Sequence, residues 1–418
     1  MKKSIVVSLL VLCLLLGGVI GYLYHRSMSD AGEPVSVPAE ESAQPGETED
    51  PAEQPAEEEV PELPPAQQMD MERLYTSHKP EERVLSVGGQ EETWDTYFYF
   101  LASQVSYVEN FFDTMRNYYG MALGWADVAE GEDKTYADMA VEGVEEALLQ
   151  FATVESFARE NGVSLNQENR EAMEQQMRTD MQTVLGADAT EEDFTAYLAG
   201  LHMSREMYER INGVNQLYQE TYRRLYGENG EKMEDAATIQ FLRDNGYLSV
   251  SHILLMTVDP TTGEALPEEA VAEKLAKAEE LAARLQAIQD PAELLLRFGE
   301  LKEEYCEDSG KAAYPAGYTF TPGTMVPEFE ETSQELTEYQ VSDPVASSYG
   351  YHIILKLPLE PDALLFSSGG SPMSARATAA NTEYGQRLQA HMDGLRVEYA
   401  QSFETPKLLD YLSQETNG

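Results

Sequence analysis

Two short segments, Ser251-His252-Ile253-Leu254-Leu255 and Gly350-Tyr351-His352-Ile353-Ile354-Leu355, decide the fold of this chain. Each is a run of apolar and β-branched residues with one histidine near its start, which is the pattern of a buried strand. If the two strands pair side by side, the imidazoles of His252 and His352 converge on one place. The sequence therefore predicts a small sheet that carries a histidine pair.

Two further segments lie between these strands. They are Glu307-Asp308-Ser309-Gly310 and Pro322-Gly323-Thr324-Met325-Val326-Pro327-Glu328-Phe329-Glu330. In this order and at this spacing, the four segments resemble the parvulin family of peptidyl-prolyl cis-trans isomerases. The resemblance implies an α+β fold in which residues 247–358 form a mixed α/β isomerase module with a small antiparallel sheet.

The resemblance also assigns candidate site residues. Those that match the hydrogen-bond network of the parvulin active site are His252, Asp308, His352 and Ser347. Those that match the wall of the proline socket are Met325, Phe329 and Phe320. An aspartate between two imidazoles would fix their tautomers and shift the pKa of all three groups.

The chemistry that these residues would support needs no cofactor. Rotation about an Xaa–Pro bond breaks no covalent bond, but amide resonance sets a barrier of about 18–20 kcal/mol. An apolar socket for the proline ring and polar groups beside the carbonyl are sufficient in principle. A metal site built from His252, His352 and Asp308 is not expected, because these three residues include no closely spaced pair of ligands.

One wall of the predicted site departs from the family pattern. Where many parvulins have a Gly-Gly-Asp-Leu-Gly-like turn, residues 310–318 read Gly-Lys-Ala-Ala-Tyr-Pro-Ala-Gly-Tyr. This change leaves two alternatives open, a holdase chaperone with a catalytically inactive parvulin-like module and an envelope scaffolding protein. Asp259 and Glu264 lie where phosphate-directed parvulins carry basic residues, so we do not expect a preference for phosphorylated substrates.

A helical domain is expected in residues 84–246, before the module. Helical periodicity and capping residues predict helices at about 93–119, 136–161, 167–185, 190–201, 204–226 and 231–245. In order and texture this region resembles the helical chaperone domain of SurA-like and PrsA-like foldases. The aromatic residues of its first helix favour core packing over a peptide groove. Residues 359–418 are expected to contain a long helix, 375–403, that packs on this domain.

The N-terminus has the pattern of a membrane segment. Lys2 and Lys3 precede an uncharged apolar run over residues 4–24, which is long enough to cross a bilayer as a helix. Residues 1–26 are therefore predicted to be an anchor or signal segment, with the body of the protein outside the cytoplasm. Residues 27–72 contain no Lys or Arg and are rich in Pro and Glu, so we expect a disordered linker.

The charge of the chain limits its partners. The formal net charge is −47, and no basic patch offsets it, so binding to nucleic acid is not expected. The two cysteines, Cys13 and Cys306, provide no disulfide framework. The sequence thus predicts a membrane-tethered or secreted isomerase that assists the folding of unfolded or nascent secreted proteins with Xaa-Pro bonds. Its oligomeric state is left open.

Overall fold

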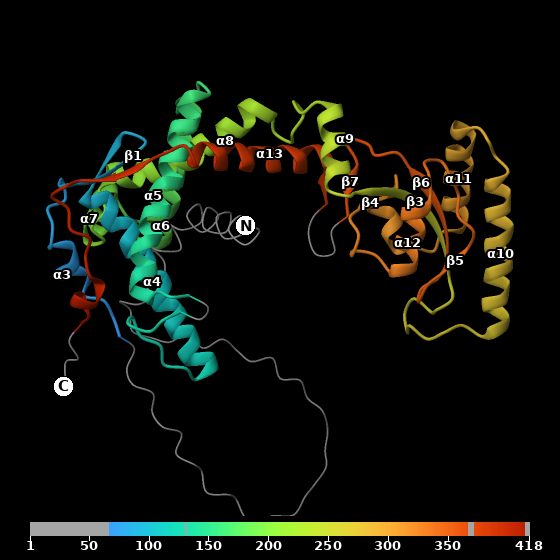
Figure 1. The fold of residues 1–418 in the computed structure, drawn as a ribbon, viewed down its shortest axis with the longest axis horizontal. Coiled ribbons are helices and arrows are strands. Elements are labelled where there is room, and N and C mark those ends of the chain that lie inside the picture. Colours follow the sequence, from blue (N-terminus) through green and yellow to red (C-terminus); the bar gives the residue numbers. More distant parts are fainter. Residues whose placement is uncertain (1–66, 130–131, 367–371, 414–418) are drawn as a thin grey trace, which may run out of the picture. The chain divides into compact units, whose positions relative to one another are not determined.

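The structure is a computed structural model that describes residues 67–129, 132–366 and 372–413, and its chain divides into two compact units (Figure 1). Unit 1 contains the residues up to Thr221 together with those from Leu388 onward, and unit 2 contains Tyr222–Arg387. The predicted membrane segment 1–26 and residues 27–66 of the predicted linker lie outside the described residues. Within the described ranges, no helix is both long enough and apolar enough to cross a membrane. The domain limits at 246 and 358 stay predictions.

Unit 1 consists mainly of helices. They are α3 (Met71–Tyr75), α4 (Trp94–Tyr119), α5 (Tyr136–Glu160), α6 (Gln167–Leu185), α7 (Glu191–Gly200) and most of α8 (Arg205–Tyr226), with the 3-10 turn η2 (Leu408–Tyr411) near the end of the chain. Capping boxes begin three of them, at Thr135, Asn166 and Thr190. In each box the side chain satisfies a backbone N–H that the first helical turn leaves unpaired.

A three-stranded antiparallel sheet accompanies these helices, and the sequence did not predict it. Its strands are β1 (Arg83–Val87), β2 (Gln90–Thr93) and β9 (Val397–Tyr399), in the order β2-β1-β9. Gly88 and Gly89 form the tight turn between β1 and β2, and both have a positive φ that favours glycine.

The sheet corrects one prediction. The helix expected over 375–403 is α13 (Ala375–Met392), which ends about ten residues early. Gly394 and the pairing of β9 with β1 place the following residues in a strand, where Val397 lies opposite Val87. Long-range pairing therefore overrides the local helical pattern.

The core of unit 1 is aromatic. The inward side of α4 contributes the buried residues Trp94, Tyr97, Phe98 and Phe100. A buried ion-pair network borders this core, because the Arg210 guanidinium binds both carboxylate oxygens of Glu92, at 2.7 and 2.8 Å, and also binds Glu155. The carboxylate of Glu92 is almost fully buried, so the bidentate contact compensates the loss of its hydration.

Unit 2 is built around a six-stranded sheet with the order β5-β6-β3-β4-β7-β8. Its strands are β3 (Leu248–Met256), β4 (Tyr318–Phe320), β5 (Val345–Ala346), β6 (Gly350–Leu357), β7 (Leu364–Leu365) and β8 (Met373–Ser374). Its helices are α9 (Asp235–Asp244), α10 (Glu268–Gln286), α11 (Pro291–Tyr305), the 3-10 turn η1 (Ser309–Ala312), α12 (Pro327–Glu335) and most of α13. All strand pairs are antiparallel except β4 with β7. The α+β fold class is confirmed.

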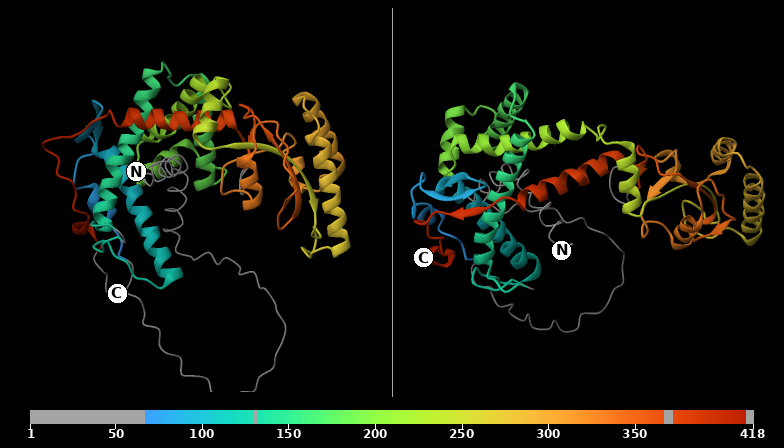
Figure 2. Two further views of the ribbon diagram at one scale, coloured as in Figure 1. Left: turned by 45° about the vertical axis from the view of Figure 1, so that its right-hand side comes forward. Right: turned by 45° about the horizontal axis from the view of Figure 1, so that its top comes forward.

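Helices cover both faces of this sheet. Helices α10 and α11 lie beside each other (Figures 1 and 2). They pack on one face of the sheet, against Ile253, Ile353 and Leu355. Helix α12 packs on the opposite face, against Val250 and Ile354. The alternation of side chains along β3 and β6 produces this division, since neighbouring residues in a strand point to opposite faces.

One boundary in unit 2 differs from the sequence prediction, because helix α9 begins at Asp235 rather than at residue 231. Helix α12 begins at Pro327, since proline is well suited to the first helical position, and Phe329 lies inside this helix. The short strands β7 and β8 precede α13.

Gly350, at the start of β6, provides a test of the central strand pair. It has φ 146°, and a Cβ at this position would overlap the carbonyl oxygen of Leu255. We expect Gly350→Ala to lower the free energy of opening of β3 and β6 by roughly 1–3 kcal/mol. Amide hydrogen exchange in these strands measures this free energy.

Gly299 is the matched control. It lies in α11, where an added Cβ would meet nothing within 4 Å. Gly299→Ala should therefore raise the stability of unit 2 by roughly 0.5–1 kcal/mol, because alanine favours a helix over glycine. Equal effects of the two substitutions would contradict the assigned packing at Gly350.

Candidate active site

The register of β3 and β6 brings the two predicted histidines together. Leu254 lies opposite His352 and His252 lies opposite Ile354, so the histidines occupy diagonal positions on the same face. The centroids of their rings are 5.3 Å apart. Both residues are buried, with exposed fractions of 6% for His252 and 5% for His352. The predicted convergence of the two imidazoles is thus present in the structure.

Ser347 contacts the second histidine. It follows β5, and its Oγ lies 2.7 Å from Nε2 of His352. The backbone N–H of Tyr349 donates to the same Oγ, at 3.1 Å. The Ser347 hydroxyl has two acceptors within reach, His352 Nε2 and the backbone carbonyl oxygen of Gly350 at 3.4 Å, and the contact with His352 is the shorter.

Asp308 lies beside the first histidine. Its Oδ2 is 3.5 Å from Nε2 of His252, and its Oδ1 accepts a hydrogen bond from the backbone N–H of Gly310, at 2.9 Å. The distance to His252 exceeds that of an ordinary hydrogen bond. Asp308 is therefore close to the histidine pair but does not bridge the two rings by hydrogen bonds.

The predicted socket residues lie next to the histidines. The ring of Phe329 contacts both imidazoles nearly edge to face, with centroids 5.2 Å from His252 and 5.3 Å from His352. Met325 is partly buried against the same apolar cluster. Phe320 is fully buried, with its ring centroid 6.0 Å from that of Phe329, so it lies in the packing beneath the socket surface.

Burial keeps both imidazoles neutral. It lowers the pKa of His352 to about 4, although the nearby carboxylates of Asp308 and Glu328 oppose this shift. Burial likewise lowers the pKa of His252, and the neighbouring His352 ring lowers it further. At neutral pH the site therefore contains two uncharged rings, each with one donor and one acceptor nitrogen.

Three ring nitrogens of the pair have no hydrogen-bond partner among the described protein groups. They are Nδ1 and Nε2 of His252 and Nδ1 of His352. A buried polar atom without a partner costs about 1–3 kcal/mol. Such atoms beside an apolar surface are suited to a polar group of a bound molecule.

Two residues that the sequence analysis missed support the site. The buried Glu330 of α12 accepts hydrogen bonds from the backbone N–H groups of Gly323, Thr324 and Met325, at 2.7–2.8 Å. Burial raises the pKa of Glu330, but these three donors outweigh it and hold that pKa below its usual range. This carboxylate fixes the loop that carries Met325. In the sequence, Glu330 reads as an ordinary exposed helix acid.

Tyr318 is the other missed residue. Its hydroxyl donates a hydrogen bond to Oδ2 of Asp308, at 2.7 Å. Its ring lies nearly parallel to that of His252, with centroids 5.5 Å apart and an interplanar angle of 14°. The only signal in the sequence is its position two residues before Phe320, on the same face of a short strand.

Within residues 67–129, 132–366 and 372–413, no group of three or more His, Cys, Asp or Glu side chains is placed to hold a metal ion. Cys306 is buried and unpaired with another cysteine. Its sulfur accepts the N–H of Leu254, at 3.4 Å, and lies 3.7 Å from the carbonyl oxygen of His252. Cys306 therefore packs against the backbone of β3.

Comparison with known proteins gives one family match and several relatives. Residues 252–357 match the family described as "Rotamase: PPIC-type PPIASE domain". The chain is 28% identical over 225 residues to the foldase protein PrsA of Oceanobacillus iheyensis, which covers 53% of this chain and 62% of that protein. It is 30% identical over 154 residues to PrsA of Geobacillus sp., which covers 36% of this chain and 54% of the relative. The chain thus spans about half to three fifths of these relatives.

Among solved structures, the crystal structure of PrsA from Bacillus subtilis is similar to this chain at 18% sequence identity. The similarity covers 65% of this chain and 91% of that one, with a TM-score of 0.22.

The neutral histidines predict acid sensitivity of unit 2. The native pKa of His352, about 4, lies below the value of about 6.5 expected in the unfolded chain. This difference stabilises the fold above about pH 6.5, and the contribution is lost as the pH falls toward 4. For His352 alone the loss is on the order of 2–3 kcal/mol at pH 4.

Hydrogen exchange in β3 and β6 across this pH range measures the effect in the wild-type protein and in His352→Gln. The substitution should reduce the dependence of stability on pH, because glutamine does not titrate. Both tryptophans, Trp94 and Trp125, lie in unit 1, so their fluorescence reports separately on that unit. The same pH dependence with and without His352 would contradict the buried, neutral state.

Proposed function

We propose that this chain is a peptidyl-prolyl cis-trans isomerase that assists the folding of secreted proteins, and the match of residues 252–357 to the PPIC-type rotamase family supports this proposal. The single observation that carries the proposal is the position of the histidine pair. Three ring nitrogens without hydrogen bonds lie beside the apolar surface of Phe329.

The geometry suits rotation about an Xaa–Pro bond. The proline ring would lie on Met325 and Phe329, and the amide would face the two imidazoles. As the bond twists, the nitrogen lone pair is no longer delocalised into the carbonyl, so an N–H donor from a neutral imidazole stabilises the twisted state more than the planar one. The protein forms no covalent bond in this scheme, which agrees with the buried position of Cys306.

The exposed end of α4 is the proposed contact for unfolded clients. Tyr118 is 82% exposed and Tyr119 is 68% exposed, and Tyr107 and Met121 are also exposed. Aromatic side chains bind apolar segments of many sequences with little loss of conformational entropy. This surface is distinct from the buried aromatic residues of the same helix, which form the core of unit 1.

A membrane tether is also part of the proposal. It rests on the apolar run over residues 4–24 and on the lysines before it. In this arrangement the acidic segment that follows would hold units 1 and 2 outside the cytoplasm, where secreted proteins fold.

The isomerase proposal is tested by exchange NMR on a short Xaa-Pro peptide. The protein should accelerate cis/trans exchange, and both His252→Ala and Met325→Ala should reduce kcat/KM by at least about tenfold, since each removes a contact to the twisted amide or the proline ring. Met373→Ala is the matched control, because Met373 is an exposed methionine of the same unit. A folded wild-type protein that leaves the exchange rate unchanged would refute the enzyme proposal.

The client surface is tested separately. Tyr118→Ser combined with Tyr119→Ser should weaken the suppression of aggregation of a refolding protein by several-fold, because it removes exposed apolar area. Isomerisation of a short peptide should remain unchanged. If aggregation suppression is also unchanged, the clients bind elsewhere. If it survives replacement of His252, Asp308 and His352 while wild-type isomerisation is absent, the protein is a holdase.

A further inference from the structure

Tyr318 holds a central place in the network around His252. It is 7% exposed, and its hydroxyl reaches the oxygen of Asp308 that lies nearest to that histidine. The same Oδ2 accepts from Tyr318 at 2.7 Å and lies 3.5 Å from His252 Nε2. The tyrosine therefore makes the short contact with this oxygen, and the histidine does not.

The Asp308 carboxylate is held on both of its oxygens. Oδ1 accepts the N–H of Gly310 and Oδ2 accepts the O–H of Tyr318. These two donors fix the orientation of the carboxylate, because each is attached to a short, ordered segment, the turn η1 and the strand β4. The carboxylate is thus satisfied without His252.

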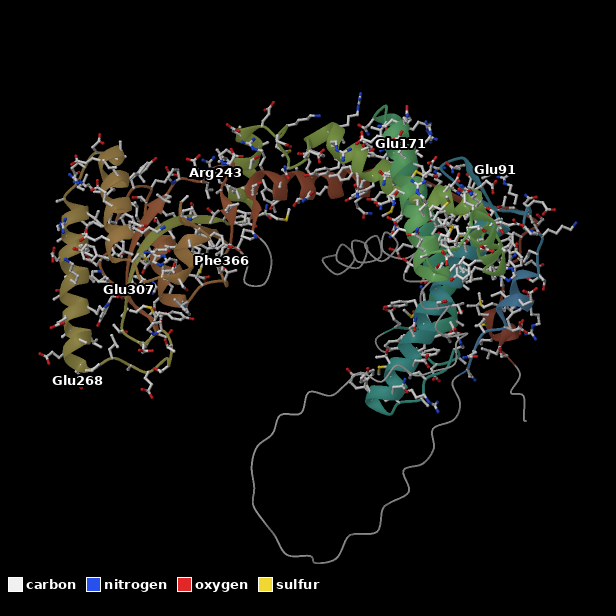
Figure 3. The ribbon with its side chains drawn as sticks, turned by 180° about the vertical axis from the view of Figure 1, so that it is seen from behind. Glu91, Glu171, Arg243, Glu268, Glu307 and Phe366 are labelled. Carbon is white, nitrogen blue, oxygen red and sulfur yellow. The ribbon has the colours of Figure 1, made fainter. Side chains whose placement is uncertain are left out.

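Contacts with several neighbouring residues fix the position of Tyr318. Its ring is packed between His252 and the rings of Tyr314 and Phe366, whose centroids lie 4.9 and 5.5 Å away. Phe366, labelled in Figure 3, follows β7, and its backbone N–H donates to the backbone carbonyl oxygen of Thr319, the residue after Tyr318. Gly310 allows the approach of the hydroxyl, because a Cβ at residue 310 would overlap the Tyr318 oxygen.

Of the charged or titratable groups around the histidine pair, some raise the pKa of a histidine and others lower it. The pKa of His252 is influenced by His352 of β6, Lys302 of α11 and Asp308 before η1, and the pKa of His352 is influenced by Asp308 and by Glu328 of α12. Lys302 donates to the carbonyl oxygen of Pro315, and burial lowers its pKa. Burial, and then the bond to Asp308, raise the pKa of Tyr318, so its hydroxyl stays protonated and remains the donor.

From this arrangement we infer that Tyr318 is a positioning residue for the proposed isomerase. Its hydroxyl holds Asp308 outside hydrogen-bonding distance of His252, which leaves the His252 imidazole uncharged and its Nε2 free for the substrate amide. Without the hydroxyl, the carboxylate would move onto His252 Nε2 and favour the imidazolium. A charge-assisted bond to Asp308 would then occupy the nitrogen that the substrate needs. This inference rests on the proposed function.

The test compares variants of the full protein. Tyr318→Phe removes the hydroxyl and retains the ring. Gly310→Ala displaces the hydroxyl without changing the tyrosine, and its added Cβ would also lie 3.3 Å from Oδ1 of Asp308. Tyr314→Phe is the matched control, because it removes a hydroxyl from the adjacent ring that does not contact Asp308.

The first measurement is an NMR titration of the His252 ring, which does not require enzymatic activity. Tyr318→Phe and Gly310→Ala should each raise the pH at which His252 gains a proton by about one unit, and Tyr314→Phe should leave it unchanged. If the titration of His252 is the same in folded Tyr318→Phe and in the wild type, the inference is overturned. If Tyr318→Phe fails to fold, the titration of His252 in Gly310→Ala takes its place, and an unchanged titration there overturns the inference.

The second measurement is the pH profile of kcat/KM for peptide isomerisation. Tyr318→Phe should lower kcat/KM and cause the activity to fall at a higher pH on the acid side than in the wild type, an effect that loss of packing alone would not produce. A lower activity with an unchanged profile would overturn the positioning role. If the wild type is inactive but the His252 titration shifts as expected, the isomerase proposal fails and the role of Tyr318 in holding Asp308 stands.

Discussion

The antiparallel pairing of β3 with β6 is the constraint on which the rest of the site depends. Its register places Leu254 opposite His352, so both histidines point to the α12 face while Ile253 and Ile353 point to α10 and α11. A slip of one residue would turn one histidine toward the other face. The apolar packing on both faces, rather than any contact of the histidines themselves, specifies the register.

The same packing accounts for the electrostatics of the site. In a chain with a net charge of −47, a histidine near a carboxylate would ordinarily be favoured in its charged form. Here burial outweighs the carboxylates, and the imidazoles remain neutral. Two carboxylates of this region are engaged elsewhere, Asp308 with Tyr318 and Gly310, and Glu330 with three backbone N–H groups.

Features that depend on local alternation were predictable from the sequence. The strands around His252 and His352, most helix limits and the apolar positions Met325 and Phe329 can be read from periodicity and from family resemblance. Ser347 was also predicted, and its contact with His352 is a short-range one across a tight turn.

Features that depend on the path of a loop, or on pairing with a distant strand, were not predictable. Tyr318 reaches Asp308 only because η1 and the loop to β4 fold back, and nothing in the residues between them encodes that return. Glu330 looks like a solvated helix acid until the preceding turn donates to it. In the sequence, the residues of β9 continue the helical pattern that begins at residue 375. In the structure they pair with β1, which lies some 300 residues earlier in the chain.

The central claim is that the histidine pair and the side chains of Met325 and Phe329 form one site that receives proline. The most direct measurement is the NMR signal of the Met325 methyl group during titration with an Xaa-Pro peptide, with an Xaa-Ala peptide as the comparison. The account predicts that the Met325 signal shifts with the proline peptide alone, in step with the ring signals of His252 and His352, while that of Met373 stays constant. A Met325 signal that is unchanged by saturating proline peptide would contradict it.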